Sequence, residues 1–186
     1  INVAEISLWV DLRFPPKHEK LPHLEAQTHR RFLKTHLPVD ALVFSPKAKY
    51  LYIMRDGRDV VWSLYNHHAK ANERFYKLIN DPSGLVGPPF PRLTWDVDEY
   101  FRKWLNEDGG FWWSFWENIR SWWEIRDLPN VQLVHFENLK RDLSGEMRKI
   151  AEFLEIPIDE SRWDTIVEHC TFDYMKQHAG LVAPLG

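Results

Sequence analysis

The 186-residue sequence is short of cysteine, of net charge and of long apolar runs. Its single cysteine, Cys170, excludes an internal disulfide and fits a reducing, cytoplasmic compartment. The net charge of −3 gives no overall positive field, so we expect neither nucleic acid nor an acidic membrane surface as a partner. No run approaches the ~18 apolar residues of a membrane span, and no signal-peptide pattern opens the chain. The length and the 44% of apolar residues suit one globular domain over residues 1–186.

What the sequence does contain is an alternation of strand and helix patterns. Two apolar runs predict strands over residues 49–54 and 131–136, the first of them a buried parallel strand. Helical patterns cover residues 57–78, 96–106, 111–126, 143–154 and 160–170, and a short helix or turn is expected over residues 25–32. Strands that alternate with helices predict an α/β fold with a parallel sheet covered by helices.

The most informative stretch is the one around the first predicted strand. Arg55 follows that strand directly, Asp56 can cap the next helix with Asp59 as a capping-box partner, and Ser63 lies about two turns into it. Just upstream, Lys34 and His36 precede a break at Pro38. An arginine at the carboxyl end of a strand, with a hydroxyl on the following helix, suits an anion bound at the crevice of an α/β sheet.

Several segments, in the same order, are similar to those of one enzyme family. They are KTHLP (34–38), RDGRDVVWS (55–63), SWWE (121–124), VQLVHFENLKRD (131–142), EMRKIAEFLEI (146–156) and CTFDYMK (170–176). The chain thus resembles the sulfotransferases of the cytosolic and bacterial type that use 3′-phosphoadenosine 5′-phosphosulfate (PAPS). The resemblance implies a three-layer, P-loop-NTPase-like parallel sheet flanked by helices, incomplete at both ends. The family's PKSGTTW loop is expected before Ile1 and its RKGxxGDW segment after Gly186.

The resemblance also implies roles for the residues around the anion. His36 matches the general base that removes a proton from the acceptor hydroxyl during in-line displacement, and an imidazole suits that task near neutral pH. Lys34 matches a cation beside the transferring sulfuryl group. Arg55 and Ser63 match the pair that grips the 3′-phosphate of PAPS and of the product, adenosine 3′,5′-bisphosphate (PAP).

Further residues match the borders of the nucleotide and acceptor sites. The rings of Phe136 and Phe172 are expected to border the adenine, with a polar contact from Cys170 or Thr171. The side chains that we expect near a hydroxyl acceptor are Trp112, Trp113, Phe115, His67 and His68. The aromatic content favours a phenol, an alcohol or a lipid over a sugar as the acceptor.

Two other functions stay open at this stage. A kinase-like phosphotransferase would share the P-loop architecture, but it needs Mg²⁺ ligands near a Walker-type loop. A non-catalytic nucleotide-binding module would have lost the phosphosulfate loop altogether. We expect no metal, because the pairs His67–His68 and His169–Cys170 are adjacent in sequence and lack the i, i+4 spacing that puts two ligands on one helix face.

Overall fold

The chain folds into two compact units, each built from segments far apart in the sequence. The structure, a computed structural model, describes residues 6–12, 15–80, 88–109 and 114–182. The helical unit comprises residues 1–37, 61–113 and 180–186, and the sheet unit comprises residues 38–60 and 114–179. The expectation of a single domain over residues 1–186 stays a prediction.

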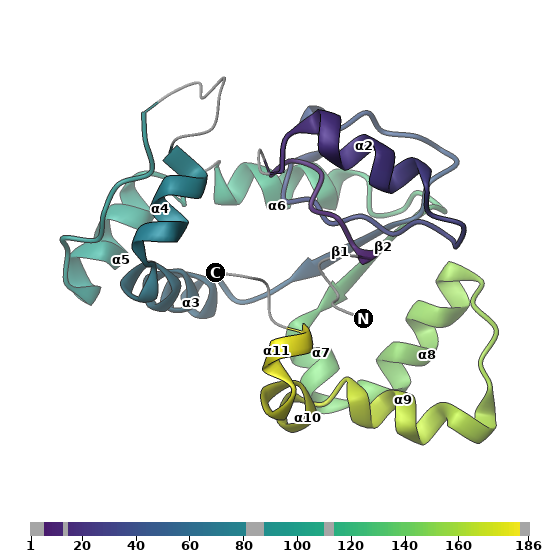
Figure 1. Ribbon diagram of the computed structural model, residues 1–186. Helices are drawn as coiled ribbons and strands as arrows, with labels where there is room; N and C mark the ends of the chain where they lie inside the picture. The colour runs from purple at the N-terminus through teal and green to yellow at the C-terminus, as the bar shows by residue number, and fades with distance from the viewer. Residues whose placement is uncertain (1–5, 13–14, 81–87, 110–113, 183–186) are drawn as a thin grey trace. The chain divides into compact units, whose positions relative to one another are not determined.

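The sheet unit is organised around two parallel strands (Figure 1). Strands β1 (Tyr50–Met54) and β2 (Val131–His135) pair in a register that runs from Tyr50 opposite Val131 to Met54 opposite His135. Both strands are rich in aromatic and branched side chains, which pack well on a pleated surface. The expected α/β class and the parallel pairing are therefore confirmed, and both strands lie within one residue of their predicted bounds.

The expectation that the first strand is buried on both faces is wrong. One face of β1 packs on helix α6 (Phe115–Glu124), where the ring of Tyr52 stacks on Trp122 with 5.2 Å between centroids. The Tyr52 hydroxyl also donates a hydrogen bond to Oδ1 of Asn118 at 2.7 Å, and burial raises the pKa of this phenol to about 12. On the other face, Leu51 and Ile53 are 38% and 62% exposed, because within the described residues no element covers them.

Helices complete the sheet unit after the second strand. They are α7 (Phe136–Arg141), α8 (Leu143–Leu154), α9 (Trp163–His169) and α10 (Phe172–Gln177), with short 3-10 turns at Val39–Ala41 and Glu160–Arg162. The buried Trp163 joins α9 to α8, since its indole N–H donates to the Ser144 hydroxyl at 2.9 Å. The helix predicted over residues 143–154 is confirmed, and that over 160–170 begins with the second 3-10 turn. The helix predicted over residues 111–126 is found at 115–124, whereas residues 111–113 lie outside the described part.

The helical unit has an aromatic core. Its helices are α2 (Lys17–Glu25), α4 (Glu73–Asn80), α5 (Val97–Asn106) and most of α3 (Gly57–Lys70), and the short α11 (Ala179–Val182) starts at the unit boundary. Tyr100 and Trp104, four residues apart on one face of α5, are each only 2% exposed. The edge of the Tyr100 ring meets Tyr65 of α3 with 5.4 Å between centroids. The helix predicted over residues 96–106 is confirmed, with Asp96 as its N-cap.

Two helix predictions in this unit are wrong. The pattern over residues 57–78 predicted one helix, but α3 ends at Lys70 and a second helix follows. The cause is Asn72, whose side chain accepts the backbone N–H of Phe75 at 2.9 Å and caps α4. Instead of the short helix or turn expected over residues 25–32, the structure has α2, which ends at Glu25. Helix α2 contains Pro22, and a proline in the sequence argues against a helix at that position. Residues 81–87 of the expected surface loop lie outside the described part.

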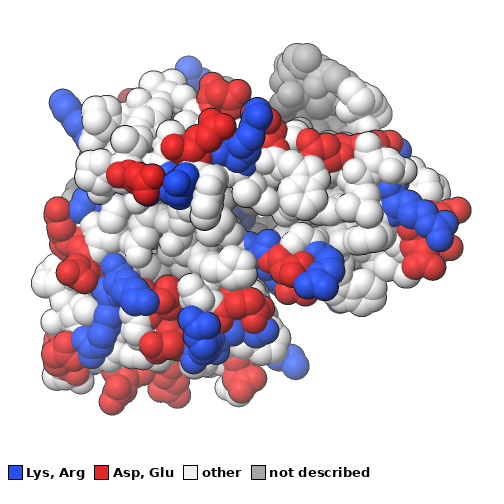
Figure 2. All heavy atoms as spheres, turned by 180° about the vertical axis from the view of Figure 1, so that it is seen from behind, with Lys and Arg blue, Asp and Glu red and all other residues white. Residues whose placement is uncertain are grey.

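In the described ranges, no helix combines the length and the apolar composition that crossing a bilayer requires. Figure 2 shows acidic and basic side chains interspersed over the face that it draws. That mixture agrees with the small net charge of the sequence.

Lys49 ties the start of β1 to the end of α8, and we expect its replacement to destabilise the sheet unit. Its ammonium donates to the Phe153 carbonyl at 2.5 Å and pairs with Glu155 Oε1 at 2.8 Å, so a cation meets the negative end of the helix. Lys49→Met should lower the free energy of unfolding by about 1 to 2 kcal/mol in urea titrations. Lys47→Met, which removes an exposed lysine two residues away, is the matched control. Equal effects of the two variants would contradict this role.

Candidate functional site

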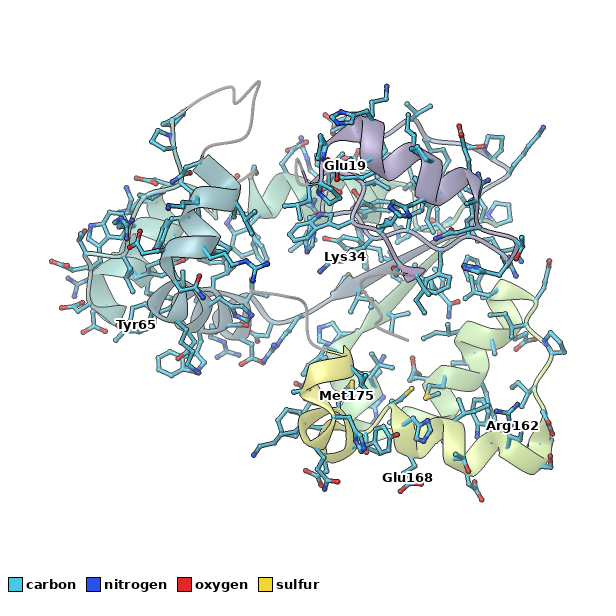
Figure 3. The ribbon with its side chains drawn as sticks, viewed as in Figure 1. Glu19, Lys34, Tyr65, Arg162, Glu168 and Met175 are labelled. Carbon is cyan, nitrogen blue, oxygen red and sulfur yellow. The ribbon has the colours of Figure 1, made fainter. Side chains whose placement is uncertain are left out.

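In the helical unit, the segment that carries Lys34 and His36 is held in an extended conformation by Trp9. The Lys34 N–H donates to the Leu8 carbonyl and the Val10 N–H donates to the Lys34 carbonyl, both at 2.9 Å. The two bonds form an isolated parallel bridge between Trp9 and Lys34. Figure 3 labels Lys34 on this segment and Glu19 on α2. Because side chains alternate along an extended chain, Lys34 and His36 project from the same face of the segment.

Both side chains meet the indole of Trp9. The Lys34 ammonium lies 4.5 Å from the centroid of the Trp9 ring, and the His36 imidazole lies 4.5 Å from it at a tilt of 48°. Lys34 is exposed and His36 is half-buried. The structure therefore brings the two predicted catalytic side chains together on one aromatic surface.

The surroundings of His36 favour the neutral imidazole. Burial is the main cause that lowers the pKa of His36 below its ordinary value, and the Lys34 cation lowers it further. The carboxylate of Asp11 acts in the opposite direction. A neutral imidazole has a lone pair available at neutral pH, which is the state that a proton acceptor needs.

In the sheet unit, Arg55 and Phe136 lie side by side at one edge of the sheet. Met54 and His135 are paired at the ends of the two parallel strands, so the residues that follow them leave the sheet at the same edge. The Arg55 guanidinium lies 4.6 Å from the centroid of the Phe136 ring. Sequence reasoning assigned both residues to a nucleotide site but did not predict this stacking contact, because their pairing depends on the strand register.

The acidic residues near Arg55 engage it only weakly. Its Nε contacts Asp59 at 3.4 Å, and within the described residues this is the only hydrogen bond of the guanidinium. Asp56 instead pairs with Arg58 at 2.7 Å, and the hydrogen bonds from Arg58 lower the pKa of Asp56 to about 2. Asp59 thus pairs with Arg55 instead of completing the expected capping box, and both Nη groups of Arg55 are left to bind an anion.

Ser63 lies in the second turn of α3, in the part of this helix that belongs to the helical unit. It is half-buried, and among the described residues its hydroxyl has no hydrogen-bond partner. Its carbonyl oxygen lies 2.8 Å from Nδ1 of the exposed His67, one turn further on. The role of Ser63 in binding a phosphate stays a prediction.

Three of the predicted adenine-contact residues lie at the start of α10, namely Cys170, Thr171 and Phe172. The Thr171 hydroxyl donates to the Glu168 carbonyl at 2.7 Å and accepts the Tyr174 N–H at 3.3 Å as the helix N-cap. One lone pair of that hydroxyl is left for a ligand. The Cys170 thiol is exposed, and the Phe172 ring is 73% exposed, far more than a core phenylalanine would be.

The residues predicted to border the acceptor have differing environments. His68 is buried to 4% exposure between Phe90 and Tyr100, with Nε2 at 2.7 Å from the Pro91 carbonyl, so its contacts favour a packing role. Phe115 is half-buried at the start of α6 and meets Trp116 edge to face. Trp112 and Trp113 lie outside the described residues. In the part of the chain that the structure describes, no cluster of three His, Cys, Asp or Glu side chains is placed to hold a metal ion.

Three residues around His36 escaped the sequence reasoning. Trp9 and Asp11 come from an irregular segment near the start of the chain, and Lys20 comes from α2. Trp9 and Asp11 contact the segment at residues 34–36, and Lys20 contacts the carbonyls of Trp9 and Leu12, so these contacts join distant parts of the sequence. The sequence around Trp9 and Asp11, LWVDL (8–12), is mostly apolar and too short to identify a strand.

The comparisons with known proteins agree with these observations. A family model described as "Sulfotransferase domain" matches residues 2–181. A glycolipid sulfotransferase of Mycobacterium bovis is 29% identical over 203 residues, which cover 98% of this chain and 62% of that protein. The chain therefore spans less than two thirds of the length of this relative.

Two solved structures have a similar fold. The crystal structure of mouse sulfotransferase SULT7A1 complexed with PAP superimposes with a TM-score of 0.70 at 24% identity, over 90% of this chain and 57% of that one. Retinol dehydratase in complex with androsterone and the inactive cofactor PAP gives a TM-score of 0.65 at 27% identity, over 86% of this chain and 42% of that one. The likeness confirms the expected P-loop-like α/β fold.

Proposed function

The chain belongs to the sulfotransferase-domain family, and from that premise we propose that its protein transfers a sulfuryl group from PAPS to the hydroxyl of a small-molecule acceptor, giving PAP and a sulfate ester. PAPS supplies an activated sulfuryl group on a bisphosphate leaving group. The observation that carries the proposal is the pairing of His36 and Lys34 on the ring of Trp9. It supplies a neutral proton acceptor and a cation from one face of a short extended segment.

In the proposed reaction, His36 takes the proton of the acceptor hydroxyl as its oxygen attacks sulfur. The lowered pKa of His36 keeps the imidazole in its basic form at neutral pH. The Lys34 ammonium stabilises negative charge on the oxygens of the sulfuryl group as they leave the bisphosphate. Because Lys34 is exposed, its ammonium can donate to an anion while it keeps its contact with the Trp9 ring.

For the nucleotide we propose the residues that the resemblance assigned to it. We assign the 3′-phosphate to Arg55, whose two Nη groups suit a bidentate contact, and to the hydroxyl of Ser63. The ring of Phe136 keeps the guanidinium in one orientation. For the adenine we propose a contact with the exposed ring of Phe172 and a polar contact from Thr171 or Cys170. These residues fit an anionic purine nucleotide, because they combine a weakly engaged cation with an exposed aromatic face.

For the acceptor we propose an apolar molecule with a hydroxyl group, such as a phenol, an alcohol or a lipid. The support is the aromatic character of the segment from residue 111 to 116 and the name of the Mycobacterium bovis relative, which acts on glycolipids. Of the predicted acceptor residues, Phe115 and the exposed His67 keep side chains that a ligand can reach. Trp112 and Trp113 stay predictions.

Nucleotide selectivity tests the proposal without knowledge of the acceptor. PAP at about 100 times its Kd should stabilise the protein by about 2.7 kcal/mol. For a chain of this size that corresponds to a rise in Tm of roughly 5 to 10 °C. AMP, which lacks the 3′-phosphate, and ATP with Mg²⁺ should shift the Tm much less at the same concentration. Stabilisation by ATP with Mg²⁺ but not by PAP would favour the phosphotransferase instead.

A further inference from the structure

Lys20 is a buried lysine outside the site described so far. Its side chain rises from α2 and is only 7% exposed. Its ammonium donates to the Trp9 carbonyl at 3.2 Å and to the Leu12 carbonyl, and the Val10 carbonyl lies at 3.5 Å. Burial lowers the pKa of Lys20, whereas the carboxylate of Asp11 raises it. Three carbonyls of one short segment thus converge on one ammonium, which fixes that segment against α2.

The segment held by Lys20 carries Asp11, whose carboxylate faces the predicted base. Oδ2 of Asp11 accepts the Trp9 indole N–H at 2.9 Å and the His36 backbone N–H at 3.4 Å. Oδ1 of Asp11 is buried and has no hydrogen-bond partner among the described residues. A buried carboxylate oxygen without a partner is costly unless a nearby positive charge compensates it.

We propose that Asp11 is a positioning residue, which orients His36 through Trp9 and the His36 backbone and sets the basicity of its imidazole, and that Lys20 fixes the segment that carries Asp11. This proposal rests on the proposed function of His36 as the base. The Asp11 carboxylate acts through His36 and is not assigned a contact with the reacting atoms. It holds the indole on which the imidazole lies, and its charge stabilises the imidazolium that forms when His36 takes the proton.

The charged groups around His36 determine whether replacement of Asp11 raises or lowers the pKa of the imidazole. Lys34 faces it from its own segment, Asp11 faces it from the segment near Trp9, and Lys20 neutralises part of the Asp11 charge from α2. Burial and Lys34 lower the pKa of His36, and Asp11 raises it. Removal of the Asp11 charge should therefore lower the pKa of His36 further and make the imidazole a weaker base.

The test replaces Asp11 with the nearly isosteric asparagine in the intact protein. In Asp11→Asn, the acid limb of kcat/KM should move to lower pH, kcat should fall roughly tenfold through weaker orientation and basicity, and the Kd for PAP should stay within about twofold. Asp11→Glu keeps the charge and should leave the acid limb near that of the parent. Glu25→Gln, which removes an exposed carboxylate from the end of α2, should change none of these quantities.

A titration of the His36 ring by NMR provides a readout that needs no turnover. The His36 resonance, assigned from its loss in His36→Ala, should titrate at lower pH in Asp11→Asn than in the parent or in Glu25→Gln. An unchanged or raised titration midpoint would overturn the role of Asp11, even if the parent transfers sulfuryl groups. A parent that titrates as described but transfers none would instead overturn the proposed function.

Lys20 is tested by double substitution. Lys20→Met keeps the aliphatic length but leaves the carbonyls of Trp9 and Leu12 without their donor. If Lys20 acts through Asp11, the double variant with Asp11→Asn should lose little more kcat than Asp11→Asn alone. If Lys20→Met does not fold, Lys20→Arg, which keeps a cation, takes its place in the same comparison. Independent, additive losses of kcat would overturn the assigned role of Lys20.

Discussion

Replacement of His36 by alanine should lower turnover by roughly two to four orders of magnitude, the usual range for loss of a positioned proton acceptor. Affinity for PAP should stay near that of the parent, because the residues assigned to the nucleotide are Arg55, Phe136 and their neighbours. His23→Ala removes an exposed histidine from α2 of the same unit and serves as the control. We expect it to turn over at the parent rate.

The dependence of turnover on pH separates a base from a residue that only packs on Trp9. Since burial and Lys34 lower the pKa of His36, the parent rate should rise with pH through a midpoint below the ordinary imidazole value and then level off. His36→Ala should lack that rise. If the variant kept turnover within about threefold, or kept the same pH dependence, His36 would have no place in the mechanism.

The second large effect is expected at Arg55. Arg55→Ala should raise the Kd for PAP roughly 10- to 100-fold, which corresponds to about 1.5 to 3 kcal/mol for a charge-assisted contact. The physical reason is that neither Nη group of Arg55 has a hydrogen-bond partner among the described residues, whereas the neighbouring Arg58 is already paired with Asp56. Titration calorimetry with PAP and with AMP measures the effect, and the affinity for AMP should change much less.

Two neighbouring residues provide the controls for Arg55. Arg58→Ala removes a guanidinium that is 84% exposed and paired with Asp56, so the affinity for PAP should change little. Asp59→Asn removes the negative charge that faces Arg55 at 3.4 Å, and PAP should bind at least as tightly as to the parent. If Arg55→Ala weakened PAP and AMP equally, the arginine would not recognise the 3′-phosphate.

Local signals in the sequence were enough for most of the secondary structure. The apolar runs located both strands, and the amphipathic pattern with its acidic cap located α8. Where the predictions fail, a competing local signal decided the structure. Asn72 caps a second helix inside a continuous helical pattern, and Pro22 is tolerated within α2. In both cases a helix-favouring pattern and a helix-ending residue stand together, and the sequence alone does not show which of the two determines the structure.

The sequence was enough to predict which residues make up the candidate site, but not how their side chains are arranged. The pattern around the first strand singled out Arg55 as a candidate anion ligand, and the family resemblance made His36 and Lys34 the candidate catalytic residues. The partners that set their chemistry come from distant segments. Phe136 reaches Arg55 only through the register of two parallel strands, and Asp11 reaches His36 only through a bridge between segments. Pairings of that kind are set by tertiary structure and leave no periodic trace in one sequence.

The central claim is that the protein moves a sulfuryl group from PAPS. The most direct measurement incubates the intact protein with ³⁵S-labelled PAPS and a phenol, androsterone or a glycolipid in turn, and follows PAP and the labelled ester together. We predict equal amounts of PAP and labelled ester with at least one acceptor, no metal requirement, and loss of both products in His36→Ala. Release of PAP without a labelled ester, or products of equal amount in His36→Ala and the parent, would contradict the account.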